Sequence, residues 1–125
     1  MKLQYEREFL ATTMPDFRFQ VRRISLAQRL RFLAVNHELM QKLKFLSAGN
    51  GTDLQEREAA AALELELGKR LLEECLCATG DCDSMQPLQP KVVEWLLHHA
   101  PTELCIEVLG RISDEISLSE PRRKN

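Results

Sequence analysis

The chain has 125 residues, of which 44% are hydrophobic and 29% charged, and its formal net charge is −2. This length suits a single domain with its own hydrophobic core, and the composition excludes collagen-like, low-complexity and disordered chains. No hydrophobic run approaches the roughly 18 residues of a membrane-spanning helix, and residues 1–10 lack the hydrophobic stretch of a secretory signal. We therefore expect a soluble protein of the cytoplasm.

The N-terminal region is predicted to form a small β element. Hydrophobic and polar side chains alternate from Phe17 to Arg22, which is the period of a strand with one buried face. Residues 3–9 alternate in the same way. The strand at 17–22 pairs either with this segment, in a hairpin, or with another molecule, and the sequence leaves both arrangements open.

Two long helices are predicted next, at residues 26–48 and 53–78. The first begins after Ser25, a favourable N-cap, and ends at the glycine-rich turn 49–51. The second ends before Gly80, which suits the position after a helix C-terminus. Because the connection is short, the two helices are expected to form an antiparallel hairpin.

Each long helix carries two hydrophobic stripes. On the first helix, one stripe is Leu26, Leu30, Leu33 and Met40, and the other is Phe32, Val35, Leu39, Leu43 and Leu46. On the second helix, one stripe is Leu54, Ala61, Leu65, Leu72 and Leu76, and the other is Leu63, Leu67 and Leu71. The hairpin buries one stripe of each helix, and the shorter C-terminal helices offer about one stripe each to cover the rest. Part of the hydrophobic surface is therefore expected to stay exposed.

We expect this exposed patch to be the partner-binding surface, used for homo-oligomer contacts or to hold a partner helix. Its candidate residues are Phe32, Val35, Leu39, Leu63 and Leu67, with the strand edge of Phe17, Phe19 and Val21 beside them. The alternative is that both stripes of each helix are buried in the hydrophobic core of a compact helical domain.

The remaining chain is predicted to contain a loop at 79–90 and two shorter helices near 90–99 and 102–116. The expected fold class is therefore mainly α, with a helical hairpin plus shorter C-terminal helices and at most a small N-terminal β element.

Residues 1–116 are predicted to be a single helical domain, followed by a polar, basic tail at 117–125. The tail is expected to stay flexible until it binds something, and its candidate partner-binding residues are Arg122, Arg123 and Lys124.

The four cysteines, Cys75, Cys77, Cys82 and Cys105, are predicted to be reduced and to be neither catalytic residues nor metal ligands. Structural zinc sites use ligand pairs on turns, whereas Cys75 and Cys77 lie about 200° apart around a helix. No serine, cysteine or histidine falls in an established catalytic motif, and no phosphate-binding glycine loop is present. We therefore expect no enzymatic activity and no cofactor.

Charge is distributed unevenly along the chain. Residues 1–50 carry nine basic and four acidic side chains, whereas residues 51–100 carry four basic and ten acidic ones. The acidic segment neutralises the basic one if the two pack together, which disfavours a nucleic-acid partner. The alternative reading is a small helical regulator that binds nucleic acid through the basic region 18–31.

Four short motifs carry a resemblance to a known family. They are Phe17, Phe19, Val21, Arg22 and Arg23; Phe45, Leu46, Ala48 and Gly49; Pro101 and Leu104; and Leu118, Ser119, Glu120, Arg123, Lys124 and Asn125. In their order and spacing they resemble small tail-assembly-chaperone-like proteins encoded with the tail genes of bacteriophages and prophages. The resemblance covers most of residues 17–125 and departs at Cys75–Gln89, where the family has a Trp-Gly turn and a short β excursion.

This resemblance implies a non-enzymatic protein that holds a long, helical tape-measure protein soluble and helps to recruit tail-tube subunits in the bacterial cytoplasm. Surplus hydrophobic stripes, a strand edge and a basic tail are features suited to binding other protein chains.

Overall fold

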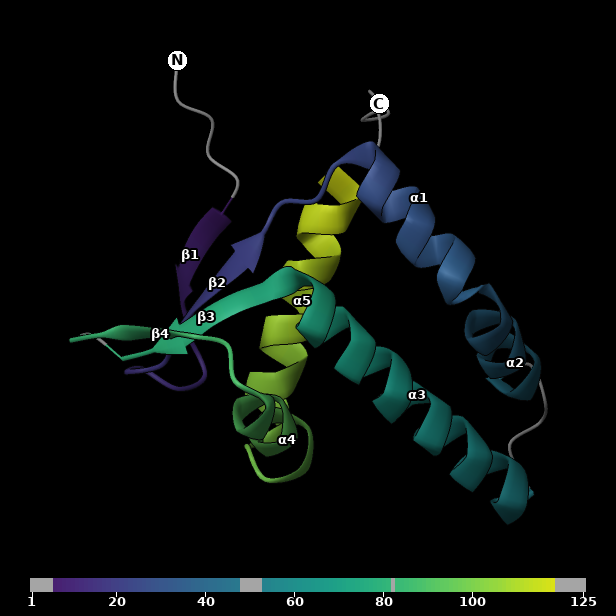
Figure 1. Cartoon of the computed structure of the whole chain (residues 1–125). Coiled ribbons are helices and arrows are strands. Elements are labelled where there is room, and N and C mark those ends of the chain that lie inside the picture. The colour runs from purple at the N-terminus through teal and green to yellow at the C-terminus, as the bar shows by residue number, and fades with distance from the viewer. Residues whose placement is uncertain (1–5, 48–52, 82, 119–125) are drawn as a thin grey trace, which may run out of the picture.

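The computed structural model describes residues 6–47, 53–81 and 83–118 (Figure 1). The elements in chain order are β1 (Glu6–Leu10), β2 (Arg18–Arg22), α1 (Leu26–Val35), α2 (His37–Ser47), α3 (Leu54–Cys75), β3 (Leu76–Gly80), β4 (Met85–Pro87), α4 (Pro90–His98) and α5 (Thr102–Leu118). The four strands form one antiparallel sheet in the order β1-β2-β3-β4. The fold is therefore mixed α and β, and the predicted mainly α fold with at most a small N-terminal β element is wrong.

The error lies in residues 76–87, which contain two of the four strands. The predicted helix 53–78 ends at Cys75, and Leu76 continues directly into β3 with an extended backbone (φ −86°, ψ 122°). Pairing with β2 satisfies the backbone of this segment and places Leu76 in the core, where 1% of the residue is exposed. These tertiary interactions outweigh the local preference that continues the helix towards Gly80.

The N-terminal strands pair within the molecule. β1 and β2 form an antiparallel hairpin in which Phe9 lies opposite Phe19, so the hairpin alternative is confirmed. β2 is also paired with β3, and Phe19 lies opposite Thr79 there. The expected strand edge at Phe17–Val21 is therefore wrong, because β2 is an internal strand and the outer strands are β1 and β4.

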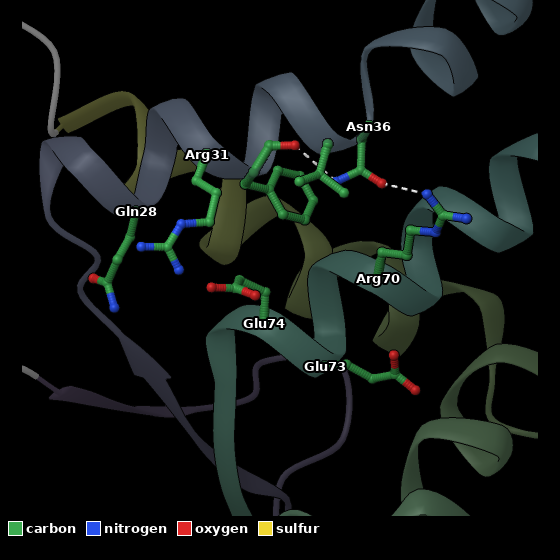
Figure 2. Close-up of a pocket in the computed structure, with 8 residues that line it drawn as sticks. Gln28, Arg31, Asn36, Arg70, Glu73 and Glu74 are labelled. Carbon is green, nitrogen blue, oxygen red and sulfur yellow. Dashed lines mark hydrogen bonds between the residues drawn. The ribbon is translucent and has the colours of Figure 1, made fainter.

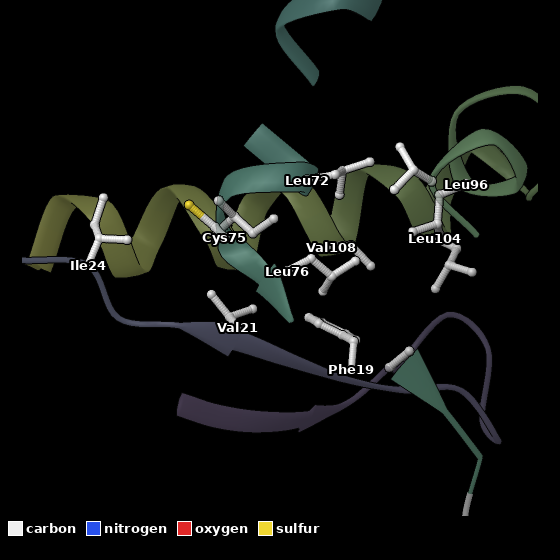
Figure 3. Packing of buried hydrophobic residues seen from close by; sticks show 12 residues of the cluster. Phe19, Val21, Ile24, Leu72, Cys75, Leu76, Leu96, Leu104 and Val108 are labelled. Atoms are coloured by element: carbon white, nitrogen blue, oxygen red, sulfur yellow. The ribbon is translucent and has the colours of Figure 1, made fainter. Parts of the chain in front are cut away.

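One face of the sheet packs against helices and carries the hydrophobic core (Figure 3). The buried side chains of this core are Ala11, Phe19, Val21, Ile24, Leu72, Cys75, Leu76, Val93, Leu96, Leu104, Val108 and Ile112. The sheet, the C-terminal end of α3, α4 and α5 together form what we term the body of the molecule. The predicted helices near 90–99 and 102–116 are confirmed as α4 and α5.

Within the body, two glutamates of α5 fasten the β1–β2 hairpin to that helix. Glu115 is 6% exposed, accepts a hydrogen bond from Arg7 Nη1 at 2.7 Å, and lies 3.5 Å from Nε of Arg23. Glu107 accepts hydrogen bonds of 2.7–3.1 Å from the backbone and hydroxyl groups of Thr12 and Thr13. Burial opposes ionisation of Glu107, but these hydrogen bonds outweigh it and lower the pKa of its carboxyl group.

The remaining helices form an arm that extends away from the body (Figure 1). The arm consists of α1, α2 and residues 54–67 of α3, and α2 packs along α3 as expected for the antiparallel hairpin. Between Leu26 and Leu67, none of the described hydrophobic side chains belongs to the buried core. Among the described residues, the hydrophobic contacts within the arm are therefore half-buried at most.

The predicted single helix 26–48 is divided into α1 and α2 at Asn36. The Asn36 amide donates a hydrogen bond to the carbonyl of Phe32 at 2.8 Å, and its side-chain oxygen accepts one from Arg70 of α3 at 2.6 Å. The Asn36 backbone N–H donates to the same Phe32 carbonyl at 3.0 Å, so the side chain caps the C-terminus of α1 without displacing the helical hydrogen bond. Asn36 is 2% exposed and connects the α1–α2 junction to α3.

Candidate functional site

The described residues contain no cluster that could hold a metal ion. Within residues 6–47, 53–81 and 83–118, no three His, Cys, Asp or Glu side chains are placed so that they could do so together. Burial raises the pKa of the Cys75 thiol to about 11 and also raises the pKa values of Cys77 and Cys105, so these thiols are protonated at neutral pH. Cys82 lies outside the described residues.

The three predicted site residues of the N-terminal strand region belong to the body. Phe19 and Val21 are fully buried. Phe17 is half-buried, and its ring centroid lies 6.1 Å from those of Phe19 and Trp95. These side chains therefore join the sheet to α4, and the tail residues Arg122, Arg123 and Lys124 lie outside the described part of the chain.

The five predicted site residues of the helical hairpin do lie on the arm. Leu39, Leu63 and Leu67 are half-buried, on elements that pack against each other. Phe32 is half-buried as well, whereas Val35 is 70% exposed. Of this predicted patch, Val35 is thus the most accessible member.

Among the described residues, six large hydrophobic side chains of the arm are between 42% and 75% exposed: Leu26, Leu30, Val35, Phe45, Leu54 and Leu65. Of these, only Val35 belongs to the predicted partner-binding patch. Apart from Val35 and Phe45, they belong to the stripe opposite the one expected to be exposed. The two stripes of each helix are equally hydrophobic, so composition carries no signal for which of them faces inward.

An open groove of about 430 Å³ separates α1 from the C-terminal half of α3 (Figure 2). Its lining residues are Gln28, Arg31, Phe32, Val35, Asn36, Arg70, Glu73 and Glu74. The α1 wall is hydrophobic and basic, whereas the α3 wall is mainly acidic. Arg70 already binds Glu66 at 2.9 Å and Asn36 at 2.6 Å.

The opposite charges on the two groove walls do not meet. Within the described chain, no ion pair of 4.0 Å or less joins Arg31 of α1 to Glu73 or Glu74 of α3. Among the lining residues, a hydrogen bond from Arg70 to Asn36 joins the two walls, at the C-terminal end of α1 (Figure 2). The groove therefore presents a basic wall and an acidic wall to whatever enters it.

A second hollow of about 590 Å³ lies between the β3–β4 hairpin and α4. Phe17, Val92 and Trp95 supply its hydrophobic surface, and Lys91 and Asp81 lie at its polar side. Hydrogen bonds from the backbone of Asp83 and Ser84 lower the pKa of the Asp81 carboxyl group. This carboxylate is thus already used to shape the β3–β4 turn.

Several basic side chains of region 18–31 are engaged within the chain. Arg18 pairs with Glu8 at 2.9 Å, and Arg23 lies beside the buried Glu115. Arg22 donates to the backbone carbonyl of Glu74 at 3.0 Å. Binding to a phosphate backbone requires several cations that are available to the phosphates. Arg18, Arg22 and Arg23 already have acceptors within the chain, so they do not form such a row.

No helix in the described residues combines the length and the hydrophobicity that crossing a bilayer requires. Comparisons of the chain with models of protein families, with curated proteins and with solved structures found no match.

Proposed function

We propose that this chain is a non-enzymatic binding protein that keeps a long, helical tape-measure protein soluble and helps to recruit tail-tube subunits during phage tail assembly. The observation that carries the proposal is the arm, which extends from the body and leaves six large hydrophobic side chains exposed. An isolated surface leucine is ordinary, but a series of them on one projecting element is typical of an interaction site.

The arm has the chemistry that an amphipathic helix needs in a partner. Phe45 lies near the C-terminus of α2 and Leu54 at the N-terminus of α3, so both are at the distal end of the arm, and Leu65 follows along α3. These side chains are 75%, 61% and 42% exposed. A partner helix that packs its hydrophobic face against them removes both surfaces from water.

The strand pair at residues 76–87 is a feature that the resemblance to tail-assembly-chaperone-like proteins leads us to expect. The family has a short β excursion in this region, and the chain has β3 and β4 there although it lacks the Trp-Gly pair. The nucleic-acid alternative has less support, because Arg18, Arg22 and Arg23 already have acceptors within the chain.

Co-expression with a tape-measure-like helical protein tests the proposal. We expect the wild-type chain to keep that protein in the soluble fraction, and Phe45→Asp and Leu65→Asp to return it to the pellet. Ile106→Asp is the matched control, because Ile106 is 64% exposed on α5 of the body. If the arm variants retain full solubilising activity, or if the wild type has none, the proposal is wrong.

Retention on nonspecific DNA tests the alternative function. A protein that neutralises several phosphates loses DNA affinity steeply as salt increases. We expect weak retention at low salt and no change in Arg31→Glu. Strong, salt-dependent retention that this variant abolishes would favour the nucleic-acid regulator instead.

A further inference from the structure

The hollow between the β3–β4 hairpin and α4 lies on the body and not on the arm that carries the proposed function. Its volume of about 590 Å³ falls within the range of about 300–1,000 Å³ that is typical of small-molecule sites in proteins. Phe17 and Trp95 contribute aromatic surface to it, and Val92 contributes an aliphatic side chain. All three are half-buried, so part of each side chain is still accessible to a ligand.

On the inner face of the sheet, a row of aromatic rings ends at this hollow. Phe9 lies opposite Phe19, and Phe19 lies opposite Thr79. The rings of Phe9 and Phe19 are stacked, with their centroids 5.5 Å apart. Residues directly opposite each other in antiparallel strands share one face, so Thr79 lies on the same face as the fully buried Phe19. At Thr79 the row therefore changes from a ring to a hydroxyl group.

Two hydrogen-bonding groups at the hollow have no partner in the part of the chain that the structure describes. Thr79 lines the hollow and is only 6% exposed, but its hydroxyl group makes no hydrogen bond to a described residue. The indole N–H of Trp95 makes none to these residues either. A hydroxyl both donates and accepts, whereas an indole only donates. Because buried polar side chains are normally hydrogen-bonded, an oxygen atom of a ligand suits this position.

The charges at the hollow balance each other. Lys91 supplies one positive charge and Asp81 one negative charge, and both side chains are exposed. Together they favour neither an anion nor a cation, and the accessible surface of the lining is mainly hydrophobic. An uncharged ligand therefore fits the lining best, because transferring a charged group to such a surface costs free energy.

An added peptide strand suits this place less well, although β4 is an outer strand of the sheet. β4 has three residues, Met85–Pro87, and ends at a proline, which has no N–H to donate. Short edge strands that contain proline discourage pairing with another chain. The hollow is therefore better matched to a compact ligand than to an extended segment.

We propose that this hollow binds a small, uncharged aromatic compound that carries one oxygen function, of which a phenol is the simplest example. Its ring lies against Phe17 and Trp95, at the centroid spacing of about 4.5–7 Å that aromatic pairs prefer. Its hydroxyl group forms a hydrogen bond with Thr79. Binding removes hydrophobic surface of both the ligand and the lining from water.

Titration with p-cresol, followed by calorimetry and by NMR, tests the site. Trp95 is the single tryptophan of the chain, so one indole N–H resonance reports on the hollow. We expect this resonance to shift in a saturable way, with a dissociation constant below about 1 mM. Toluene, which has the same ring but no oxygen, is expected to bind more weakly.

Variants of Thr79 test the hydrogen bond separately from the hydrophobic contacts. Thr79→Val keeps the shape of the side chain without the hydroxyl group, so it is expected to weaken p-cresol binding about 3–10-fold and to leave toluene binding unchanged. Thr79→Ser retains a hydroxyl group and is expected to keep the preference for p-cresol. Thr102→Val, at an exposed position of α5, is the matched control and should bind both compounds as the wild type does.

Absence of saturable p-cresol binding to the wild type overturns the proposal. Equal affinities for p-cresol and toluene, or a Thr79→Val variant that keeps the wild-type preference, overturn it as well, since the ligand oxygen then does not meet Thr79. Tighter binding of para-hydroxybenzoate that is lost in Lys91→Gln shows that the site takes an anion, and it overturns the uncharged class. All of these measurements use the purified chain alone, so they succeed or fail independently of the function proposed for the arm.

Discussion

At the residue scale, a few buried or hydrogen-bonded polar side chains determine how the pieces of the chain are oriented. Asn36 divides the helical segment 26–47 and connects it to α3, and Glu107 and Glu115 hold the β1–β2 hairpin on α5. The long-range contacts are not visible from residue type alone, because Asn36 and Arg70, Thr12 and Glu107, and Arg7 and Glu115 are each more than 30 residues apart. The Ser25 cap is different, since capping is local, and it is correctly predicted.

Replacing Asn36 with alanine is expected to lower the free energy of unfolding by about 1–3 kcal/mol, because two hydrogen bonds of a buried group are lost and the Phe32 carbonyl and Arg70 each lose a partner. Urea denaturation measures the change. Gln55→Ala, at an exposed position of α3, is the matched control. Equal stability of both variants would show that the Asn36 bridge contributes nothing.

Glu107 is expected to make the stability of the body depend on pH. Its pKa is lowered in the folded state, so its stabilising contribution is complete above the unfolded pKa of about 4.3 and is lost as the pH falls through the lower folded value. The stability difference between wild type and Glu107→Gln, measured by urea denaturation, should therefore shrink from pH 6 to about pH 3. A difference that stays constant or grows on acidification would contradict this assignment.

At the element scale, the contacts of α3 explain both the successful and the failed predictions. The hairpin with α2 follows from hydrophobic periodicity and a short connection, so it is predictable. The switch from α3 to β3 at residues 75 and 76 is not, because the sequence Leu76–Gly80 has no alternation and Gly80 resembles a helix cap. What makes it a strand is pairing with β2, which lies more than 50 residues earlier.

Gly68 and Gly80 lie on either side of this switch, and replacing each with alanine is expected to change the stability of the fold in opposite directions. A Cβ at Gly68 lies 3.5 Å from Leu97 and 3.8 Å from Leu109, which are ordinary contacts, so Gly68→Ala gains helix propensity and stabilises by about 0.5–1 kcal/mol. A Cβ at Gly80 lies 2.1 Å from the Ser84 backbone oxygen, so Gly80→Ala forces the β3–β4 hairpin apart.

Thermal unfolding followed by circular dichroism checks this pair. The melting temperature should rise in Gly68→Ala and fall in Gly80→Ala. A rise in both variants would mean that the β3–β4 hairpin adds nothing to the stability of the body.

At the scale of the whole molecule, buried hydrophobic side chains are confined to the body, and the arm has none that is fully buried. The sequence predicts an exposed hydrophobic surface on the hairpin, but it does not predict which stripe is exposed. Packing of the C-terminal half of α3 against α4 and α5 fixes which side of α3 faces inward, and the sheet that positions α4 and α5 is the part of the fold that was missed.

Hydrogen–deuterium exchange is therefore expected to separate the two parts. Amides of α1 and α2 should exchange faster than those of β2 and α5, because local opening needs less free energy where few hydrophobic contacts are broken. Equal protection of α1 and α5 at high dilution would show that the arm is as stable as the body.

The order of the strands in the sheet also determines how long a growing chain exposes hydrophobic side chains during synthesis. β1 and β2 leave the ribosome before the other elements of this fold, but β2 acquires its second neighbour only when β3 has emerged, and the cover of Phe19 and Val21 is complete only when α5 has followed. A two-stranded hairpin is marginal in water on its own. Chains that stop before residue 102 lack α5, which packs on β2, and they are therefore expected to be degraded or to aggregate while chains that include α5 fold.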